Sequence, residues 1–278
     1  MSPLSNRCWG QNVPTLVDSL WRREHIRSMS NCFERYEIDH LSPSACNLFV
    51  ASPAMYVMER VLKRKAPVGA AAHRGNAVEA GIAKGLFEDA SLDECVSEAR
   101  KTFAGLASLS GDPRKEKEIA AIPAMVKVGL QELKPYGKPS SAQGKIEWKV
   151  EGLHVPMIGF YDFEWEDHGI LVDLKTTHKL PSKISTNHAR QVALYNAARG
   201  NNLDTRVCYT TPSKTAVYRL ENSDEHVRAL EKIARTIQNF LSISNDPLEL
   251  ASIVVPDVDS FYFADPLARK HAFEVFGI

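Results

Sequence analysis

The chain has 278 residues, an apolar fraction of 44% and a formal net charge of +0. This length suits one large domain or two small ones, and the apolar fraction is sufficient for a full core. A zero net charge excludes a surface that attracts polyanions as a whole, so nucleic-acid binding would need a local basic patch. The five cysteines are scattered and form no Cys-x-x-Cys pair. That pattern favours reduced thiols over disulfides, zinc or an iron–sulfur cluster.

Membrane and export signals are missing from the sequence. No stretch approaches the roughly 18 uninterrupted apolar residues of a membrane span. The first 30 residues lack the hydrophobic segment of a signal peptide. We therefore expect a cytoplasmic protein without a membrane partner.

The N-terminal half is predicted to be helical after an arm over residues 1–38. Ser42-Pro43 and Ser52-Pro53 each place an N-cap residue before a proline at the first helical position, so each should begin a short helix. A third helix should begin near Ala70. Two further helices are expected over 91–109 and 114–134, the second bent near Pro123.

Strands dominate the second half of the chain. Alternating or continuous apolar runs predict three successive strands, then a helix, two more strands and a long amphipathic helix. The expected ranges are 144–151, 155–165 and 169–176 for the first strands, 185–199 for the helix, 204–210 and 214–220 for the later strands, and 224–243 for the last helix.

The stretch IGFYDFEWEDHGILVDLKTTHKL carries the clearest chemical signal. It predicts a β-hairpin with Asp162 in its first strand and with Asp173 and Lys175 in its second. Residues two apart on a strand point to the same face, so Asp173 and Lys175 should project together. Two neighbouring acids suit Mg²⁺ or Mn²⁺ rather than zinc, and a lysine can serve the attacking water or a phosphate.

Context separates this motif from two other acid-x-Lys matches, Glu132-Leu133-Lys134 and Glu147-Trp148-Lys149. The first ends a helical stretch, and no acid-bearing strand precedes the second. Only Asp173 and Lys175 follow an apolar run that is best buried as a central strand. Buried charges are usually paired or bind a metal, so a plain Asp–Lys ion pair at a strand end is the structural alternative.

Five ordered segments of the sequence resemble the PD-(D/E)xK nuclease superfamily, in its RecB-like exonuclease branch. They run from Leu41 to about Leu220. The segments are LSPSACNLFVASPAMYVMERVL, RGNAVEAG, KIEWKV, the hairpin IGFYDFEW with VDLKTT, and RQVALYNAA. In the second segment Glu79 stands where the family often has His. Ser52 replaces the first cluster ligand of the iron–sulfur members, and the C-terminal part has no cysteine, so we expect no iron–sulfur cluster.

The resemblance implies an α/β fold: a restriction-endonuclease-like core with a mixed central β-sheet flanked by helices, plus an N-terminal helical region. On this basis residues 39–278 should form one nuclease domain. Its expected parts are a helical part over 39–140, a catalytic core over 141–245 and a C-terminal extension over 246–278.

The resemblance also implies Mg²⁺- or Mn²⁺-dependent cleavage of DNA, without zinc. The implied metal ligands are Glu79, Asp162, Asp173 and the carbonyl of Leu174. The implied catalytic residues are Asp162, Asp173, Lys175, Gln191 and Tyr195. Gln191 and Tyr195 are four residues apart and share a helix face, although a core tyrosine with a capping glutamine is an equally simple explanation.

Basic residues near the motif are the candidate DNA contacts: Arg74, Lys179, Lys183 and Arg190. The Arg60, Lys63, Arg64, Lys65 cluster is either a solvated helix end or a second backbone contact. Glu147 and His73 are weaker candidates for supporting roles. A Walker A motif is absent, so the sequence contains no helicase motor.

We therefore expect a metal-dependent DNA exonuclease that acts in recombination, repair or phage DNA processing. A recombination or single-strand-binding protein is the kind of partner that such a role admits. Two alternatives stay open: a catalytically silent DNA-binding module of the same fold and a structure-specific endonuclease.

Overall fold

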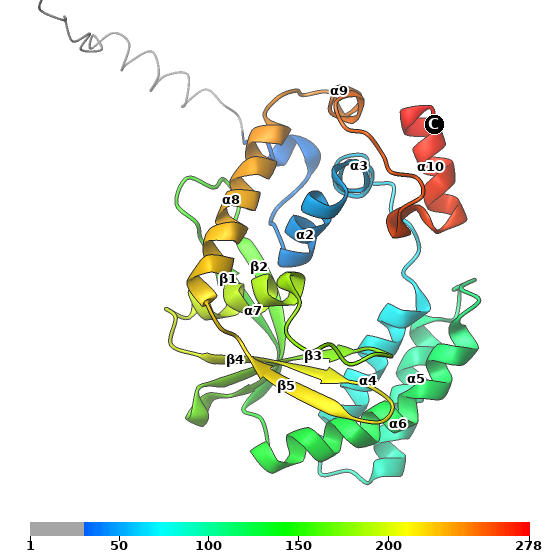
Figure 1. Cartoon of the computed structure of the whole chain (residues 1–278), viewed down its shortest axis with the longest axis vertical. Helices are drawn as coiled ribbons and strands as arrows, with labels where there is room; N and C mark the ends of the chain where they lie inside the picture. The colour runs from blue at the N-terminus through cyan, green and yellow to red at the C-terminus, as the bar shows by residue number, and fades with distance from the viewer. Residues whose placement is uncertain (1–30) are drawn as a thin grey trace, which may run out of the picture.

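A mixed five-stranded sheet forms the centre of the computed structural model, which describes residues 31–278. Its spatial order is β1-β2-β3-β4-β5, the same as the order along the chain (Figure 1). The strands are β1 (Ser141–Trp148), β2 (Met157–Trp165), β3 (Ile170–Thr176), β4 (Asp204–Thr210) and β5 (Thr215–Arg219). β3 and β4 run parallel, while the other neighbours are antiparallel.

A helical crossover, α7 (Thr186–Ala198), joins the parallel strands β3 and β4. It begins at Ser185, whose hydroxyl accepts a hydrogen bond from the backbone N–H of His188, and it ends before Gly200, which has φ +72°. A parallel pair cannot be joined by a tight turn, so this helix is a topological requirement as well as a cover for the sheet.

Helices cover both faces of the sheet. On one face lie α4 (Ala70–Phe87), α5 (Leu92–Leu106) and α6 (Lys115–Leu133), followed by η3 (Lys134–Tyr136). They bury Val172 and Leu174 of β3. On the other face α7 and α8 (Ser223–Leu241) pack with α2 (Pro43–Ala51) and bury Leu171. Alternate residues of β3 therefore serve opposite layers, as the pleat of a strand requires.

A third apolar cluster joins the short helices near residues 53–61 to the C-terminal segment. It contains Met55 and Met58 of α3 (Pro53–Tyr56) and η2 (Val57–Val61), together with Phe263 near the C-terminus. The C-terminal segment that supplies the other half comprises α9 (Pro247–Ser252), η5 (Phe261–Phe263) and α10 (Pro266–Phe276). An ion pair between Arg64 and Glu274, with an N–O distance of 2.6 Å, adds to this contact. In Figure 1 these elements lie together above the sheet.

Residues 31–38 belong to the packed structure. η1 (Glu34–Tyr36) brings Phe33 and Tyr36 into the main core, where both are buried. The Tyr36 hydroxyl donates a 2.6 Å hydrogen bond to the carbonyl of Ser244. Residues 31–38 of the expected arm therefore pack against the core, and residues 1–30 lie outside the described residues.

The expected fold class is confirmed: a mixed sheet flanked by helices, with a helical N-terminal region. Ser42 and Ser52 cap α2 and α3 through their side chains, each with Pro at the first helical position. Each predicted strand range overlaps a strand of the sheet. None of the helices within residues 31–278 combines the length and apolar character that a membrane crossing requires.

We predict that Gly81→Ala destabilises the helical layer. A Cβ atom at Gly81 would lie 2.7 Å from the backbone carbonyl oxygen of Cys95, so α4 and α5 would have to separate. The free energy of unfolding should fall by about 1–3 kcal/mol, the usual cost of overpacking, as measured by urea denaturation. The control is Gly105→Ala in α5, where a Cβ meets nothing within 4 Å. Equal stabilities of the two variants would contradict this account.

Candidate active site

The site begins where β2 and β3 separate. Their pairing extends only to Phe163 and Val172, so the next opposed positions are Asp162 and Asp173. Instead of continuing the ladder, the Asp162 carboxylate accepts a 2.6 Å hydrogen bond from the backbone N–H of Leu174. The side chain thereby takes the place of a backbone acceptor, and both acids lie at the point where the strands diverge.

Asp173 is completely buried and is held from two sides. Its Oδ2 lies 2.5 Å from Nζ of Lys175, the residue on the same face of β3. Its Oδ1 accepts a 2.9 Å hydrogen bond from Gln191 Nε2 on α7. Tyr195 completes this arrangement, because its hydroxyl lies 2.7 Å from Gln191 Nε2 and donates to the carbonyl of Phe160 at 2.6 Å. Four of the predicted catalytic residues thus lie together: Asp173, Lys175, Gln191 and Tyr195. Asp162, which is also predicted to be catalytic, lies beside them.

Glu79 reaches the same region from α4. Its Oε1 accepts a hydrogen bond from Nε2 of Gln143 on β1. Gln143 has φ +53°, and the β1–β2 pairing skips it, since Ala142 opposes Phe163 and Gly144 opposes Tyr161. This irregular position in β1 is opposite Asp162 in the sheet, and its side chain contacts Glu79. Gln143 therefore lies next to both acids.

The three carboxylates interact electrostatically. Burial, and then the charge of Asp173, raise the pKa of Glu79 to about 7. Burial, Asp173 and Glu79 raise the pKa of Asp162 well above its usual range. Burial alone would lower the pKa of Lys175, but the Asp173 and Asp162 carboxylates outweigh it and raise that pKa. The ionised forms of Glu79 and Asp162 are therefore disfavoured by burial and by their acidic neighbours, and a bound cation would stabilise them.

The donor set fits a hard divalent cation in its chemistry. Three carboxylates and the nearby Leu174 carbonyl are oxygen ligands, as Mg²⁺ prefers. Asp173 Oδ2 accepts no well-directed hydrogen bond among the described residues and has only the Lys175 ammonium beside it. Within residues 31–278, however, no three His, Cys, Asp or Glu side chains are already arranged around one metal position. One oxygen of Asp162 and one of Glu79 instead accept hydrogen bonds from the Leu174 N–H and from Gln143.

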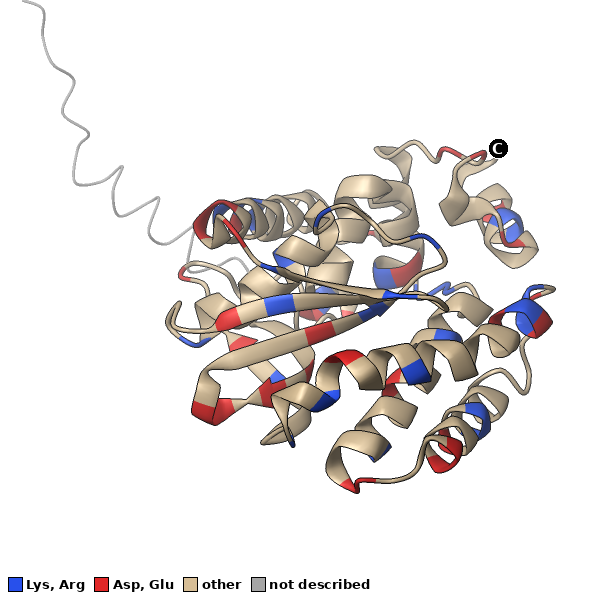
Figure 2. Cartoon of the chain, turned by 60° about the horizontal axis from the view of Figure 1, so that its bottom comes forward, with Lys and Arg blue, Asp and Glu red and all other residues tan. Residues whose placement is uncertain are grey.

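The predicted DNA contacts occupy different environments. Arg74 is only 4% exposed, and its guanidinium pairs with Glu118 and donates to the Thr176 carbonyl at 3.1 Å. This placement favours a structural role. Arg190 is half-buried and donates to Asn47 Oδ1 at 3.0 Å. Lys179 and Lys183 are exposed beyond β3, where phosphate contacts remain sterically possible. In Figure 2 acidic and basic residues are interspersed over the helices and strands in view.

Several neighbours of the site were not singled out from the sequence. Glu118 on α6 holds both Arg74 and His178, the latter with a 3.0 Å contact to Nε2. His188 on α7 lies next to Lys175 in one cavity. A glutamate within an ordinary helix carries no sequence signal, but His188 could have been found, because it precedes Gln191 by three residues and so shares its helix face.

The comparison with known proteins identifies the family. The family model described as "PD-(D/E)XK nuclease superfamily" matches residues 40–257, well over half of the chain. The chain belongs to the PD-(D/E)XK nuclease superfamily. Membership implies nuclease activity, DNA as the substrate and the use of divalent metal ions, which is typical of these enzymes.

Other comparisons add little to this assignment. One solved structure, described as "Crystal structure of SSO0001", is 18% identical, covers 45% of this chain and 69% of that chain, and has a TM-score of 0.31. No curated protein matches the chain. The RecB-like branch of the PD-(D/E)XK nuclease superfamily therefore remains a prediction.

We predict that Glu79 makes the metal-free enzyme less stable as the pH rises. Its pKa is about 7 in the folded state, against an ordinary value of 4.5, so the folded state binds more protons between these pH values. Stability should then fall from about pH 4.5 to about pH 7. Glu79→Gln should remove the contribution of Glu79 to this fall, which is at most about 3.5 kcal/mol for a shift from 4.5 to about 7 at about 1.4 kcal/mol per pKa unit.

Chemical denaturation in EDTA at pH 5, 6.5 and 8 measures this effect. The matched control is Glu147→Gln on β1, whose carboxylate forms an ion pair with Lys145 at 3.3 Å. If the stabilities of wild type and Glu79→Gln depend on pH in the same way, Glu79 is not the source of the pH dependence.

Proposed function

We propose that this protein is a metal-dependent deoxyribonuclease, specifically an exonuclease of the RecB-like branch without an iron–sulfur cluster. The observation that carries the proposal is the contact between Gln191 on α7 and the buried Asp173 beside Lys175. This contact supports a catalytic role for the Gln-x-x-x-Tyr helix beside the Asp-x-Lys strand. A role in recombination, repair or phage DNA processing agrees with such an activity.

Glu79, Asp162, Asp173 and the Leu174 carbonyl would hold Mg²⁺ or Mn²⁺. When bound, the cation would polarise the scissile phosphate and lower the pKa of the attacking water. The Lys175 ammonium, which is charged because its pKa is raised, would orient that water and stabilise negative charge that grows on the phosphate oxygens. Gln191 would fix the orientation of the Asp173 carboxylate, and Tyr195 would fix Gln191 through the 2.7 Å contact between them.

End-labelled DNA distinguishes the candidate activities. Single- and double-stranded substrates, labelled at either end, would be incubated with Mg²⁺, Mn²⁺ or EDTA. An exonuclease releases short products from one end, and the label that disappears first reports its polarity. Internal cuts at defined structures would instead indicate an endonuclease, and binding without cleavage in either metal would indicate a silent DNA-binding module.

Asp173→Asn and Lys175→Ala should each lower the rate of cleavage by about 10²-fold or more, the scale for losing one electrostatic stabiliser of the transition state. DNA binding should largely survive, because contacts elsewhere to the phosphates supply most of the affinity. Single-turnover cleavage and fluorescence anisotropy measure the two quantities. Asp167→Asn in the exposed turn between β2 and β3 is the control, and wild-type rates in both site variants would rule out the mechanism.

Lys179 and Lys183 should contribute through phosphate contacts. Each neutralised phosphate adds about −0.7 to −0.9 to the slope of log K against log salt. Replacing both lysines by Ala should therefore weaken binding and make the slope less negative, to a similar extent for all DNA sequences. The control pair is Lys101→Ala and Lys232→Ala, on the exposed faces of α5 and α8. A wild-type slope in the Lys179 and Lys183 double variant would show that these residues are merely solvated.

A further inference from the structure

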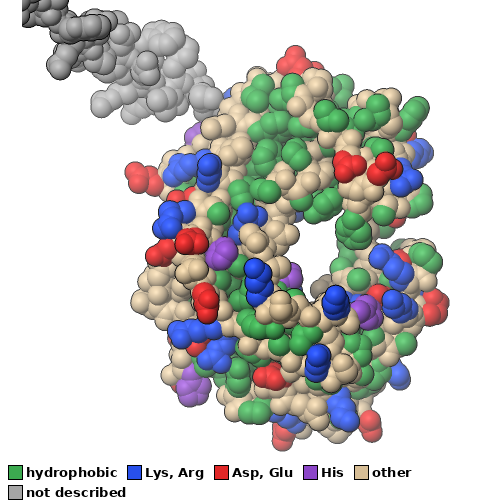
Figure 3. All heavy atoms as spheres, in the orientation of Figure 1, with side chains coloured by type: hydrophobic (Ala, Val, Ile, Leu, Met, Phe, Trp, Pro, Cys, Tyr) green, Lys and Arg blue, Asp and Glu red, His purple; other side chains and the backbone are tan. Residues whose placement is uncertain are grey.

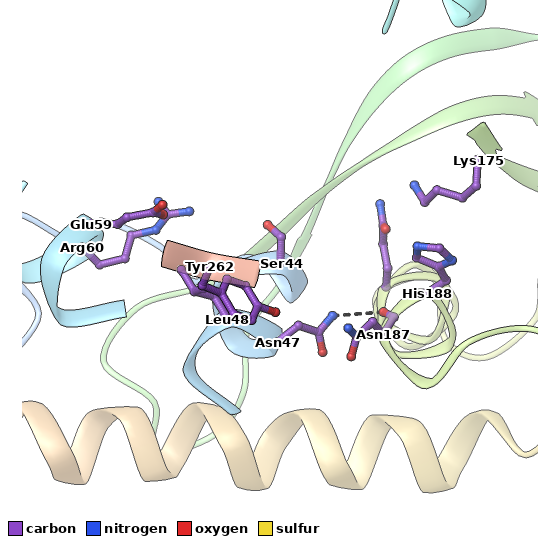
Figure 4. A pocket seen from close by; sticks show the side chains of 10 residues that line it. Ser44, Asn47, Leu48, Glu59, Arg60, Lys175, Asn187, His188 and Tyr262 are labelled. Atoms are coloured by element: carbon purple, nitrogen blue, oxygen red, sulfur yellow. Dashed lines mark hydrogen bonds between the residues drawn. The ribbon is translucent and has the colours of Figure 1, made fainter. Parts of the chain in front are cut away.

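A cavity of about 500 Å³ extends from the catalytic lysine to the helices above the sheet. Its walls come from segments far apart in the sequence: α2, η2, β3, α7 and η5. In the space-filling view of Figure 3 the molecule is hollowed at its centre, between the C-terminal and N-terminal helices above and the sheet with α4 to α6 below. The close-up in Figure 4 places Lys175 and His188 on one side of the cavity and Arg60 and Glu59 on the other, with Tyr262 and Ser44 between.

His188 is held in a defined orientation on the Lys175 side. Its Nδ1 lies 2.7 Å from the hydroxyl of Tyr209 on β4, and that hydroxyl accepts a 3.2 Å hydrogen bond from the backbone N–H of Ser185. The Tyr209 proton is then available for Nδ1, which leaves the imidazole proton on Nε2 as a donor. Burial and the charge of Lys175 lower the pKa of His188, so the ring is neutral and this tautomer can persist.

The opposite side of the cavity offers a cationic group, Arg60. In the basic cluster of residues 60–65, Lys63 donates to the Tyr36 carbonyl at 2.5 Å and Arg64 pairs with Glu274. Arg60 faces the cavity instead, and its Nε is buried without a hydrogen-bond partner among residues 31–278. Glu59 is the acidic group beside it, and burial raises the pKa of that carboxyl. Within the described part of the chain, the buried Nε of Arg60 therefore lacks an acceptor.

Tyr262 supplies an aromatic surface between the two sides. It lies in η5, which is fixed to η2 through the apolar cluster of Met58 and Phe263. The ring of Tyr262 is partly buried and lines the cavity. Aromatic rings that alternate with phosphate-binding groups are the usual elements of single-strand recognition, because every base can stack on such a ring.

We propose that this cavity binds one unpaired nucleotide of the substrate strand, next to the scissile phosphate. This deepens the proposed nuclease function and rests on it. His188 Nε2 donates to an oxygen of the phosphate near Lys175, Tyr262 stacks on the base, and Arg60 binds the following phosphate. Cavities of about 300–1,000 Å³ enclose one ligand of drug size. That size class accommodates a single nucleotide but not a stacked duplex, so the strand must be unpaired where it passes Tyr262.

A scan with abasic sites tests the stacking contact. Fluorescent single-stranded oligonucleotides that each lack one base, at successive positions from the end, would be titrated in EDTA. Wild-type affinity should fall by about tenfold at one position, the scale of losing one base–aromatic stack. In Tyr262→Leu the same position should have no further effect, whereas Tyr262→Phe should retain it. Phe273→Leu is the control, because Phe273 is 67% exposed on α10 and does not line the cavity.

Arg60→Gln and His188→Gln test the two phosphate contacts. The matched controls are Arg100→Gln on the exposed face of α5 and His168→Gln in the exposed turn between β2 and β3. The first two should weaken binding of single-stranded DNA at least several-fold and reduce cleavage of single-stranded ends more than the controls do. Identical abasic profiles in wild type and Tyr262→Leu, or no loss in Arg60→Gln and His188→Gln, would overturn the site. If the wild type cleaves DNA but the variants bind and cleave as it does, the cavity site is wrong and the nuclease function stands. If no metal supports cleavage, the nuclease function is wrong, and the binding profiles still test the cavity.

Discussion

The geometry of the site depends on one replacement in the sheet: the Asp162 carboxylate accepts the hydrogen bond of the Leu174 N–H at 2.6 Å. A buried backbone donor must find an acceptor, and here a side chain provides it where the strand partner has moved away. The two strands can therefore separate without leaving Leu174 unpaired. Asp162 and Asp173 thereby lie at opposed positions where the strands diverge, while the pleat of β3 directs Asp173 and Lys175 toward α7 and the cavity beyond it.

The Arg74–Glu118 pair holds the neighbouring helices in a compatible position. Both side chains are almost fully buried, and Arg74 also donates to the Thr176 carbonyl at the end of β3. The guanidinium thus links α4, which carries Glu79, to the strand that carries Asp173 and to α6. Removing one partner of such a pair would leave a buried charge without compensation, which typically costs about 3–5 kcal/mol. The Arg74–Glu118 pair therefore fixes the position of α4, and with it the position of Glu79, relative to the sheet.

The sequence was most informative where local periodicity determines the structure. The two-residue spacing on a buried strand placed Asp173 and Lys175 on one face, and the four-residue spacing on a helix placed Gln191 and Tyr195 together. Long-range packing was harder to foresee. Arg74 resembled a surface residue because arginine is rarely buried, and its partner Glu118 lies 44 residues away. Phe33 and Tyr36 carried no periodic pattern, and the partner of the Tyr36 hydroxyl, the Ser244 carbonyl, lies 208 residues away.

The acidic residues of the site lower the stability of the metal-free fold. The chain concentrates Glu79, Asp162 and Asp173 around a single ammonium group, and burial raises the pKa of the first two because their charges are poorly solvated. A folded state that bound no cation would gain stability from apolar residues at these positions. Packing alone therefore does not explain these carboxylates. A divalent cation between them would attract each carboxylate and so outweigh their mutual repulsion. Because these carboxylates destabilise the metal-free fold, we infer that the cluster has a functional role. Acids with strongly shifted pKa values are concentrated at functional sites.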